Sequence, residues 1–492
     1  MSPEPAAAPL TVPDLLRHRA RVQPDGVAFV VDGATELTYE DWEKRSNALA
    51  HRLLAGGAGR GERIGLYFGG MEWIEYAVAY FAVLKSGATA VHLNADQPAA
   101  ELDRRISVAA VSRLVHAPDR TVPAGWAGPA LSTDALDGAD RTPPPVAIAP
   151  EDLADVVFTS GTTGPAKAYT IPHGNAVFGR RPDAMDAFGS ASYLVTTLQL
   201  ATGSSASALN IATISKVVTV FAPPDDIDRG GQLIEKYRAG MVAITPWIAN
   251  QMVLARLHET YDLSSVGMFA CGSAPLPPAR ARQLLEMVPG ARITSACSQS
   301  EASPALCVNV FDPEHPMSVG RPTPITELRV VDEEGADLPT GRVGEIWLRH
   351  PAPKRLYLGL PEVNERITAD GWYRTGDLGH LDAEGRVHFF DRRADAVPTA
   401  GGPVSTPAVE AALYEHPAVR EAAAFGIPAG AAVQQVAAAV VLDPAQDGTG
   451  LEEHLAARLD PGRRPVRVVT LDALPRNAQN KVLKRELRER FG

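Results

Sequence analysis

Apolar runs and helical segments alternate through the first hundred residues of the chain. The runs at 27–31, 63–68 and 88–93 are short and rich in β-branched and aromatic residues, as is typical of buried strands. Residues 71–87 form a longer apolar segment that ends in Gly87, which predicts a helix. This strand–helix–strand order predicts a mostly parallel sheet covered by helices.

The pattern changes twice further along the chain. Two strand-like runs around turn residues at 326–351 predict antiparallel pairing. From about residue 392 the elements become short and mix helix with strand, so we expect domains at 1–391 and 392–492. Residues 456–492 hold ten Lys/Arg against four Asp/Glu. That excess is typical either of a solvated helix face or of a surface that docks a phosphate-bearing or acidic partner.

Composition narrows the class of protein. The 492 residues are 45% hydrophobic and 21% charged, which excludes a disordered chain. A net charge of −11 argues against nucleic acid as a partner. The sequence has neither an apolar stretch long enough to span a membrane nor the pattern of a secretory signal. Three cysteines without C-x-x-C spacing exclude a disulfide framework. We therefore expect a cytoplasmic protein.

The richest chemistry lies in the segment FTSGTTGPAK, which directly follows an apolar strand-like run. Its glycines, hydroxyls and lysine suit a phosphate cradle, in which backbone N–H groups and hydroxyls bind oxygens and the lysine supplies charge. It is neither a Walker loop nor a dinucleotide fingerprint, because the spacing differs and the following AYTI predicts a strand. The cradle residues are Thr159, Ser160, Gly161, Thr162, Thr163, Gly164 and Lys167.

TSGTTG-x-x-K also resembles the signature loop of the adenylate-forming ligases, the superfamily of acyl-CoA synthetases, carrier-protein adenylation domains and beetle luciferases. Further segments resemble that superfamily's motifs, in its order and along nearly the whole chain. They are LKSGATAVHLNADQP (84–98), GSAPLPP (272–278), SQSEA (298–302), VGRP (319–322), GEIWLR (344–349), GWYRTGDLG (371–379), DRRAD (391–395) and LPRNAQNK (474–481).

The resemblance implies an α/β fold with a large N-terminal domain of layered α/β subdomains and a small β-barrel-like element. A smaller, mobile α+β domain would act as a C-terminal lid. The implied reaction joins a carboxylic acid to a thiol through an acyl-adenylate, with ATP, Mg²⁺ and coenzyme A. The thiol belongs to coenzyme A or to a free-standing carrier protein, and the oligomeric state is left open.

The resemblance also implies roles for single residues. Lys481 would bridge the carboxylate and the α-phosphate, Ser300 would face the α-phosphate, and Glu301 would hold Mg²⁺. Asp377 would accept hydrogen bonds from the ribose, and Arg392 would contact the nucleotide. The plainer interpretations are a turn-forming aspartate and solvated surface charges. The adenine side would be formed by Gly272, Ser273, Ala274 and Cys297.

Several positions depart from the superfamily's pattern. Cys297 stands where an aromatic ring stacks on adenine, alanines flank Lys167, Ala394 occupies the hinge position, and Asn480 replaces a glycine. These departures favour, as a second hypothesis, an enzyme that mainly uses a preformed acyl-adenylate. The motifs are also compatible with a ligase that loads a carrier protein and with a non-catalytic nucleotide-binding relative.

The segment LQLATGSSASALN (198–210) bears on the acid. It is uncharged, whereas domains that activate α-amino acids usually place an aspartate there, so we expect a plain carboxylic acid. Its small residues suggest room for a bulky apolar acyl group, with Leu198, Trp247 and Val319 as candidate walls. His173, which follows the phosphate loop, is expected to cap the next helix.

Overall fold

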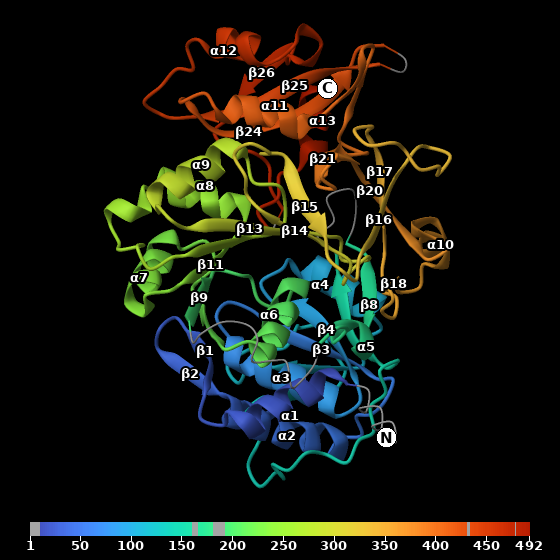
Figure 1. Cartoon of the computed structure of the whole chain (residues 1–492). Helices are drawn as coiled ribbons and strands as arrows, with labels where there is room; N and C mark the ends of the chain where they lie inside the picture. Colours follow the sequence, from blue (N-terminus) through green and yellow to red (C-terminus); the bar gives the residue numbers. More distant parts are fainter. Residues whose placement is uncertain (1–9, 160–165, 181–191, 431–432, 478) are drawn as a thin grey trace, which may run out of the picture. The chain divides into compact units, whose positions relative to one another are not determined.

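A computed structural model describes residues 10–159, 166–180, 192–430, 433–477 and 479–492. Helices and strands follow one another along the whole chain (Figure 1). The chain folds into two compact units. Unit 1 comprises Met1–Thr159, Ala166–Met241 and Pro351–Asn364, and unit 2 comprises Ser160–Pro165, Val242–His350 and Glu365–Gly492. No helix in the described parts of the chain is long and apolar enough to cross a membrane.

The main sheet of unit 1 has the strand order β18-β8-β7-β4-β3-β5-β6. Its centre is parallel, as the strand–helix–strand pattern predicted, and β8 is antiparallel to both of its neighbours. The strands are β3 (Arg63–Phe68), β4 (Thr89–Asn94), β5 (Arg113–His116), β6 (Ala130–Ser132), β7 (Leu153–Phe158), β8 (Ala168–Pro172) and β18 (Leu356–Tyr357).

Four more strands of unit 1 pair in the order β9-β10-β1-β2, with only β2 antiparallel. They are β1 (Val27–Val31), β2 (Thr35–Thr38), β9 (Ser192–Thr196) and β10 (Val217–Phe221). The helices are α1 (Val12–Val22), α2 (Tyr39–Ala55), α3 (Trp73–Lys85), α4 (Ala99–Val108), α5 (His173–Ala176), α6 (Gly203–Ile214) and α7 (Ile227–Tyr237). Helix α3 is the apolar helix that the sequence predicted, and nearly all of it is buried.

A buried polar network ties helices α3 and α6 to the sheet of unit 1. The Tyr76 hydroxyl lies 2.7 Å from His92 Nδ1 and 3.0 Å from the Ser205 hydroxyl. His92 Nε2 lies 2.9 Å from a carboxylate oxygen of Asp155. Burial raises the pKa of the Tyr76 hydroxyl far above its ordinary value, so it stays protonated and able to donate. Each of these polar groups thus finds a partner inside the core.

The long sheet of unit 2 begins with parallel pairing between β12 and β13 and becomes antiparallel from β14 onward. Its order is β16-β17-β20-β21-β15-β14-β13-β12-β11, and β19 pairs with β20. The antiparallel strands correspond to the expected β-barrel-like element and pair in this linear order. The strands are β11 (Met241–Ile244), β12 (Met268–Cys271), β13 (Arg292–Cys297), β14 (Cys307–Val310), β15 (Ser318–Pro322), β16 (Glu327–Val331), β17 (Gly344–Arg349), β19 (Thr368–Ala369), β20 (Trp372–Leu381) and β21 (Val387–Arg392).

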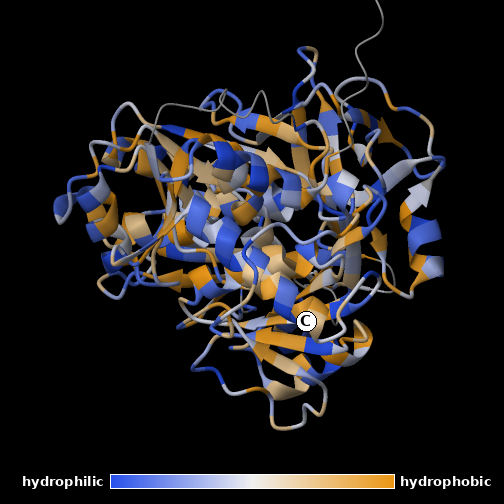
Figure 2. Ribbon diagram, turned by 90° about the horizontal axis from the view of Figure 1, so that it is seen from below, coloured by the Kyte–Doolittle hydropathy of each residue, from blue (hydrophilic) through white to orange (hydrophobic). Residues whose placement is uncertain are grey.

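The C-terminal part of unit 2 is the expected α+β segment, a sheet with core on both faces. Along β24, Ala422 and Ala424 enter one apolar cluster and Ala423 and Phe425 enter the other. Figure 2 shows apolar residues along the strands near the C-terminus. The strands are β22 (Val397–Thr399), β23 (Gly402–Val404), β24 (Val419–Pro428), β25 (Gln434–Leu442) and β26 (Arg467–Thr470). Its helices are α11 (Thr406–Tyr414), α12 (Leu451–Arg458) and α13 (Lys484–Phe491). Helices α8 (Pro246–Leu254) and α9 (Pro278–Met287) belong to the earlier part of unit 2, and α10 (Pro361–Ile367) begins in the last segment of unit 1 and ends in unit 2.

The basic residues of the tail largely pair inside unit 2. Lys484 lies 2.7 Å from a carboxylate oxygen of Glu410 and donates to the Thr406 hydroxyl, which in turn donates to Asp391. Nearby carboxylates raise the pKa of Lys484 although its burial opposes this. Further pairs are Arg458–Glu415, Arg476–Glu421 and Arg488–Asp395. These contacts favour a structural use of the tail over a docking surface, and the boundary at residue 392 stays a prediction.

Candidate active site

The predicted phosphate loop lies between β7 and β8, two strands of unit 1. Thr159 N–H donates to the Lys167 carbonyl at 2.9 Å, and Lys167 N–H donates to the Thr159 hydroxyl at 3.1 Å. These bonds close the base of the loop, and the strand predicted after Lys167 is β8. Ala168, one of the two flanking alanines, is buried in the core of unit 1. The predicted cradle residues Ser160, Gly161, Thr162, Thr163 and Gly164 lie outside the described residues.

Two cationic side chains lie at the end of this loop. Lys167 is exposed, and its ammonium lies 5.7 Å from the centre of the Tyr357 ring. Arg104 donates to the Ala166 carbonyl at 2.9 Å and also binds Glu101 on its own helix. Arg104 and Arg105 lower the pKa of Glu101 to about 2, so that carboxylate stays ionised and holds both arginines. Arg104 carries no distinguishing signal in the sequence, because its i, i+3 pairing with Glu101 is typical of any exposed helix.

Gly272, Ser273 and Ala274 follow the carboxyl end of β12, and Cys297 ends the neighbouring parallel strand β13. The carboxyl ends of adjacent parallel strands share one edge of a sheet, which is where ligands bind in such sheets. Gly272 N–H donates to the Ile244 carbonyl at 3.0 Å, and Ser273 has a φ of +81°. Directly after the strand, the turn therefore has a backbone conformation that residues other than glycine rarely adopt.

Asp377 lies opposite Arg392 in the β20–β21 pair. Arg392 Nε is 3.3 Å from Asp377 Oδ1, and Gln299 Nε2 donates to Asp377 Oδ2 at 3.0 Å. Burial raises the pKa of Asp377, and the charge of Arg392 and the Gln299 hydrogen bond oppose that rise. Oδ1 is buried yet accepts no hydrogen bond from the described residues. It is therefore an acceptor suited to a hydroxyl donor from a ligand.

Cys297 lies beside this pair. Burial raises the pKa of its thiol to about 12, with a further rise from the negative charge of Asp377 and an opposing effect of Arg392. Across the β13–β14 pair it faces Cys307. Burial also raises the pKa values of Cys271 and Cys307 to about 12, so these thiols lack the thiolate character of nucleophiles. They are instead small apolar side chains that pack within unit 2.

Lys481 closes a short hairpin turn of unit 2. Asn477 N–H donates to the Lys481 carbonyl at 3.0 Å, and Lys481 N–H donates to the Asn477 side-chain oxygen at 3.0 Å. Burial and the charge of Arg392 lower the pKa of Lys481. Because the charge of Arg392 acts on the Lys481 ammonium, this turn places Lys481 near the Asp377–Arg392 pair.

Glu301 is half-buried and its charge also raises the pKa of Asp377, whereas Ser300 is exposed. Five predicted residues of unit 2 lie close enough to affect one another's pKa values. They are Cys297, Glu301, Asp377, Arg392 and Lys481. Thr159 and Lys167 belong to unit 1. Gln299 belongs to the same set through its hydrogen bond to Asp377, although the sequence alone predicts no role for it. Only its position within the SQSEA motif (298–302) points to the site.

The backbone explains one departure from the superfamily's pattern. Asn480 has a φ of +59°, in the left-handed region that glycine adopts freely and asparagine tolerates. Ala394 lies in the turn after Arg392, where the N–H groups of Asp395 and Ala396 both donate to the Arg392 carbonyl at 2.9 Å. Asparagine is thus compatible with the turn that presents Lys481.

Asn480→Gly is expected to leave the thermal stability of the chain nearly unchanged, whereas Asn480→Val is expected to lower it. A β-branched residue at this φ costs about 1–2 kcal/mol, because its branched Cβ crowds the backbone and, unlike asparagine, it cannot hydrogen-bond the backbone locally. Thermal unfolding of both variants, followed by circular dichroism, measures the difference. Equal midpoints for the valine variant and the wild type would contradict the left-handed conformation.

The structure corrects the expectation for His173. Its ring does not cap α5, in which it is the first residue; instead its Nδ1 accepts the Val12 N–H at 3.3 Å, at the start of α1. Burial lowers the pKa of His173 to about 4, so the neutral ring can act as an acceptor. Sequence reasoning missed this contact because the two residues are 161 positions apart.

The small residues of 198–210 pack into unit 1. Ser205, Ala201 and Ala206 are buried, and a Cβ added at Gly203 would meet Val157 at 2.9 Å. Their small size therefore serves close packing, and it no longer supports a roomy acyl pocket. The candidate walls belong to different units, Leu198 to unit 1 and Trp247 and Val319 to unit 2.

Models of known families match most of the chain. The AMP-binding enzyme model matches residues 16–358, and the model of the AMP-binding enzyme C-terminal domain matches residues 408–481. The chain belongs to the AMP-binding enzyme family. The predicted superfamily and the predicted class of enzyme, an adenylate-forming ligase, are confirmed at this level.

Relatives and solved structures agree with this family. A feruloyl-CoA synthase of Amycolatopsis sp is 31% identical over 96% of this chain and 98% of its own length. The fatty acid–[acyl-carrier-protein] ligase ScoC of Streptomyces coeruleorubidus is 28% identical over 96% of this chain and 95% of its own. The anthranilate CoA ligase AuaEII, solved with anthranoyl-AMP, matches 98% of this chain and 97% of its own with a TM-score of 0.87. At 21% identity AuaEII shows the fold, which confirms the predicted α/β architecture with a smaller C-terminal part.

Proposed function

We propose that this chain is an acyl-CoA ligase that joins a carboxylic acid to coenzyme A through an acyl-adenylate. The observation that carries the proposal is the buried Oδ1 of Asp377, an unused acceptor beside Arg392. A ribose hydroxyl would donate to it, and the Gln299 amide would keep the carboxylate in place.

The other residues of unit 2 would serve the adenylation step. Lys481 would supply positive charge where the acid's carboxylate attacks the α-phosphorus of ATP, and Ser300 would face the α-phosphate. Arg392 would contact the nucleotide. The attack forms the bond between the acid and the phosphate and releases pyrophosphate. Gly272, Ser273, Ala274 and Cys297 would flank the adenine.

Glu301 would hold Mg²⁺, and Thr159 and Lys167 would bind phosphate oxygens of ATP. Glu301 offers carboxylate oxygens, the ligands that Mg²⁺ prefers, and the ion when bound neutralises phosphate charge. Thr159 and Lys167, with the loop residues between them, would cradle the β- and γ-phosphates. Residues 392–492 would form the lid, and Ala394 would be its hinge position.

The acid is proposed to be a plain carboxylic acid, since residues 198–210 are uncharged. The name feruloyl-CoA synthase, carried by a relative at 31% identity, supports both an acid of this kind and coenzyme A as the acceptor. The name of ScoC supports an acyl-carrier protein as a second candidate acceptor. A bulky apolar acyl group stays part of the proposal, without support from the size of residues in this segment.

The test is a panel of carboxylic acids assayed for ATP–pyrophosphate exchange and for thioester formation, with and without coenzyme A. We expect acid-dependent exchange, and thioester only when coenzyme A is added. A thioester formed on an acyl-carrier protein alone would make the carrier protein the acceptor. Thioester from synthetic acyl-adenylate without any exchange would favour the enzyme that uses preformed adenylate, which Cys297 and Ala166 suggest. Absence of both reactions would leave a non-catalytic relative.

A further inference from the structure

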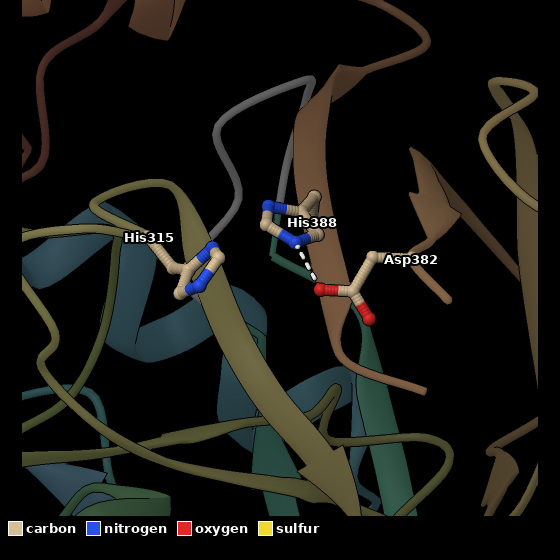
Figure 3. A group of neighbouring side chains, drawn as sticks. All are labelled: His315, Asp382 and His388. Carbon is tan, nitrogen blue, oxygen red and sulfur yellow. Dashed lines mark hydrogen bonds and ion pairs between the residues drawn. The ribbon is translucent and has the colours of Figure 1, made fainter. Parts of the chain in front are cut away.

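Three metal-ligating side chains meet at the turn between β20 and β21, apart from the residues of the proposed site. Asp382 follows β20, His388 lies on β21, and His315 lies on the segment before β15 (Figure 3). One ligand atom from each residue lies within 4.8 Å of the other two, and all three side chains are half-buried.

Asp382 is held rigidly in this turn. Its Oδ1 accepts the N–H groups of Glu384 at 3.0 Å and Arg386 at 2.7 Å, and its Oδ2 lies 2.9 Å from His388 Nε2. The carboxylate is therefore a preoriented donor.

A cation already sits against the cluster. Arg386 Nη1 lies 3.1 Å from His315 Nε2, 3.4 Å from Asp382 Oδ2 and 3.7 Å from a carboxylate oxygen of Glu384. The ring of His380 stacks on His388 with centroids 4.9 Å apart. Two of the three donors thus face one positive group, and the stacked ring limits how far His388 can turn.

We propose that His315, Asp382 and His388 bind a divalent transition-metal ion, with Zn²⁺ the best fit, when the Arg386 guanidinium moves aside. Two imidazoles and one carboxylate form a donor set of Zn²⁺, with water as a fourth ligand, whereas Mg²⁺ prefers oxygen donors. His388 would bind through Nε2 with its proton on Nδ1. Because the Arg386 side chain is long and 28% exposed, it can turn toward solvent.

The geometry needs only modest closure. Zn²⁺ holds nitrogen and oxygen ligands at about 2.0–2.2 Å, so tetrahedral ligand atoms lie about 3.3 Å apart. The Asp382–His388 contact of 2.9 Å is already near that value, and His315 is the ligand that must approach. The ion would link the segment before β15 to the hairpin that carries Asp377 and ends at Arg392. We therefore expect Zn²⁺ to raise the thermal stability of the chain.

The test titrates Zn²⁺ into the full-length protein in excess Mg²⁺, by calorimetry and by competition with a chromophoric chelator. We expect the wild type to bind one more Zn²⁺ than His315→Ala or His388→Ala, and His258→Ala, an exposed histidine elsewhere, to match the wild type. Arg386→Gln removes the competing charge and should tighten binding about tenfold. Circular dichroism establishes that each variant is folded.

Co²⁺ gives a second readout that does not depend on stability or on ligase activity. We expect visible absorption bands of a tetrahedral Co²⁺ site in the wild type, and their loss in His388→Ala. Equal Zn²⁺ stoichiometry in wild type and both histidine variants would overturn the proposal. So would a wild type that binds no Zn²⁺ while Arg386→Gln does, because the arginine would then be the resident cation of the native chain.

Discussion

Replacing Lys481 by alanine is expected to slow acyl-adenylate formation about 100- to 1,000-fold. Thioester formation from a preformed acyl-adenylate is expected to change much less. The attacking carboxylate and the α-phosphate are both negative, and a cation between them stabilises the transition state of the first half-reaction only. The second half-reaction begins after that bond has formed.

The surroundings of Lys481 suit this role. The hairpin turn fixes its backbone through Asn477, and burial, together with the Arg392 charge, lowers the pKa of its ammonium. A lysine in such surroundings is less solvated than one on an open surface, so its charge acts more strongly on a nearby phosphate. Removing it therefore costs more than removing a solvated lysine.

The measurement compares ATP–pyrophosphate exchange with thioester formation from synthetic acyl-adenylate, in Lys481→Ala and Lys481→Gln. Arg485→Ala is the matched control, because Arg485 is an exposed cation of the same tail, paired only with Glu489 in the described part of the chain. We expect the control to retain both rates. An equal loss of both half-reactions in the Lys481 variants would remove this residue from the adenylation step.

The elements of the fold could be predicted where local pattern decides them. The run at 63–68 is strand β3, and 71–87 contains helix α3. A short apolar run between polar segments favours a buried strand, whereas a longer one favours a buried helix. The resemblance to a superfamily located Asp377 and Lys481 by their motifs. It could not tell that Asp377 Oδ1 accepts no hydrogen bond within the described part of the chain, since this depends on the register that sets Arg392 opposite it.

Contacts between residues far apart in the chain could not be predicted from the sequence. The hydrogen bond from the start of α1 to His173 and the meeting of His315 with Asp382 depend on tertiary packing, which no local period encodes. The small residues of 198–210 suggested a roomy acyl pocket for a related reason. Gly203 is as compatible with close packing on Val157 as with a pocket, and only the tertiary structure separates the two.

Asp377→Ala is expected to raise the KM for ATP about 10- to 100-fold, with a smaller effect on kcat. Hydrogen bonds to a charged group contribute about 1.5–3 kcal/mol, and about 1.4 kcal/mol corresponds to tenfold in affinity. The carboxylate is 13% exposed and already partnered at Oδ2, so the ribose would be held by Oδ1 against little competition from water. Asp377→Asn keeps an acceptor oxygen without the charge, and we expect it to fall between alanine and the wild type.

Calorimetric titration with ATP, alongside steady-state kinetics, separates this role from a structural one. Loss of Asp377 also leaves Arg392 and Gln299 without their partner, which could loosen the β20–β21 pair without any role in binding. Asp337→Ala is the matched control, because it removes an ion-paired aspartate with a 68% exposed side chain from the same unit. If Asp377→Ala and Asp377→Asn are folded and bind ATP as tightly as this control, the orphaned oxygen is not a nucleotide ligand. The alanine–asparagine difference decides the chemistry further, since a ribose hydroxyl can donate to an amide oxygen but gains less from it than from a carboxylate.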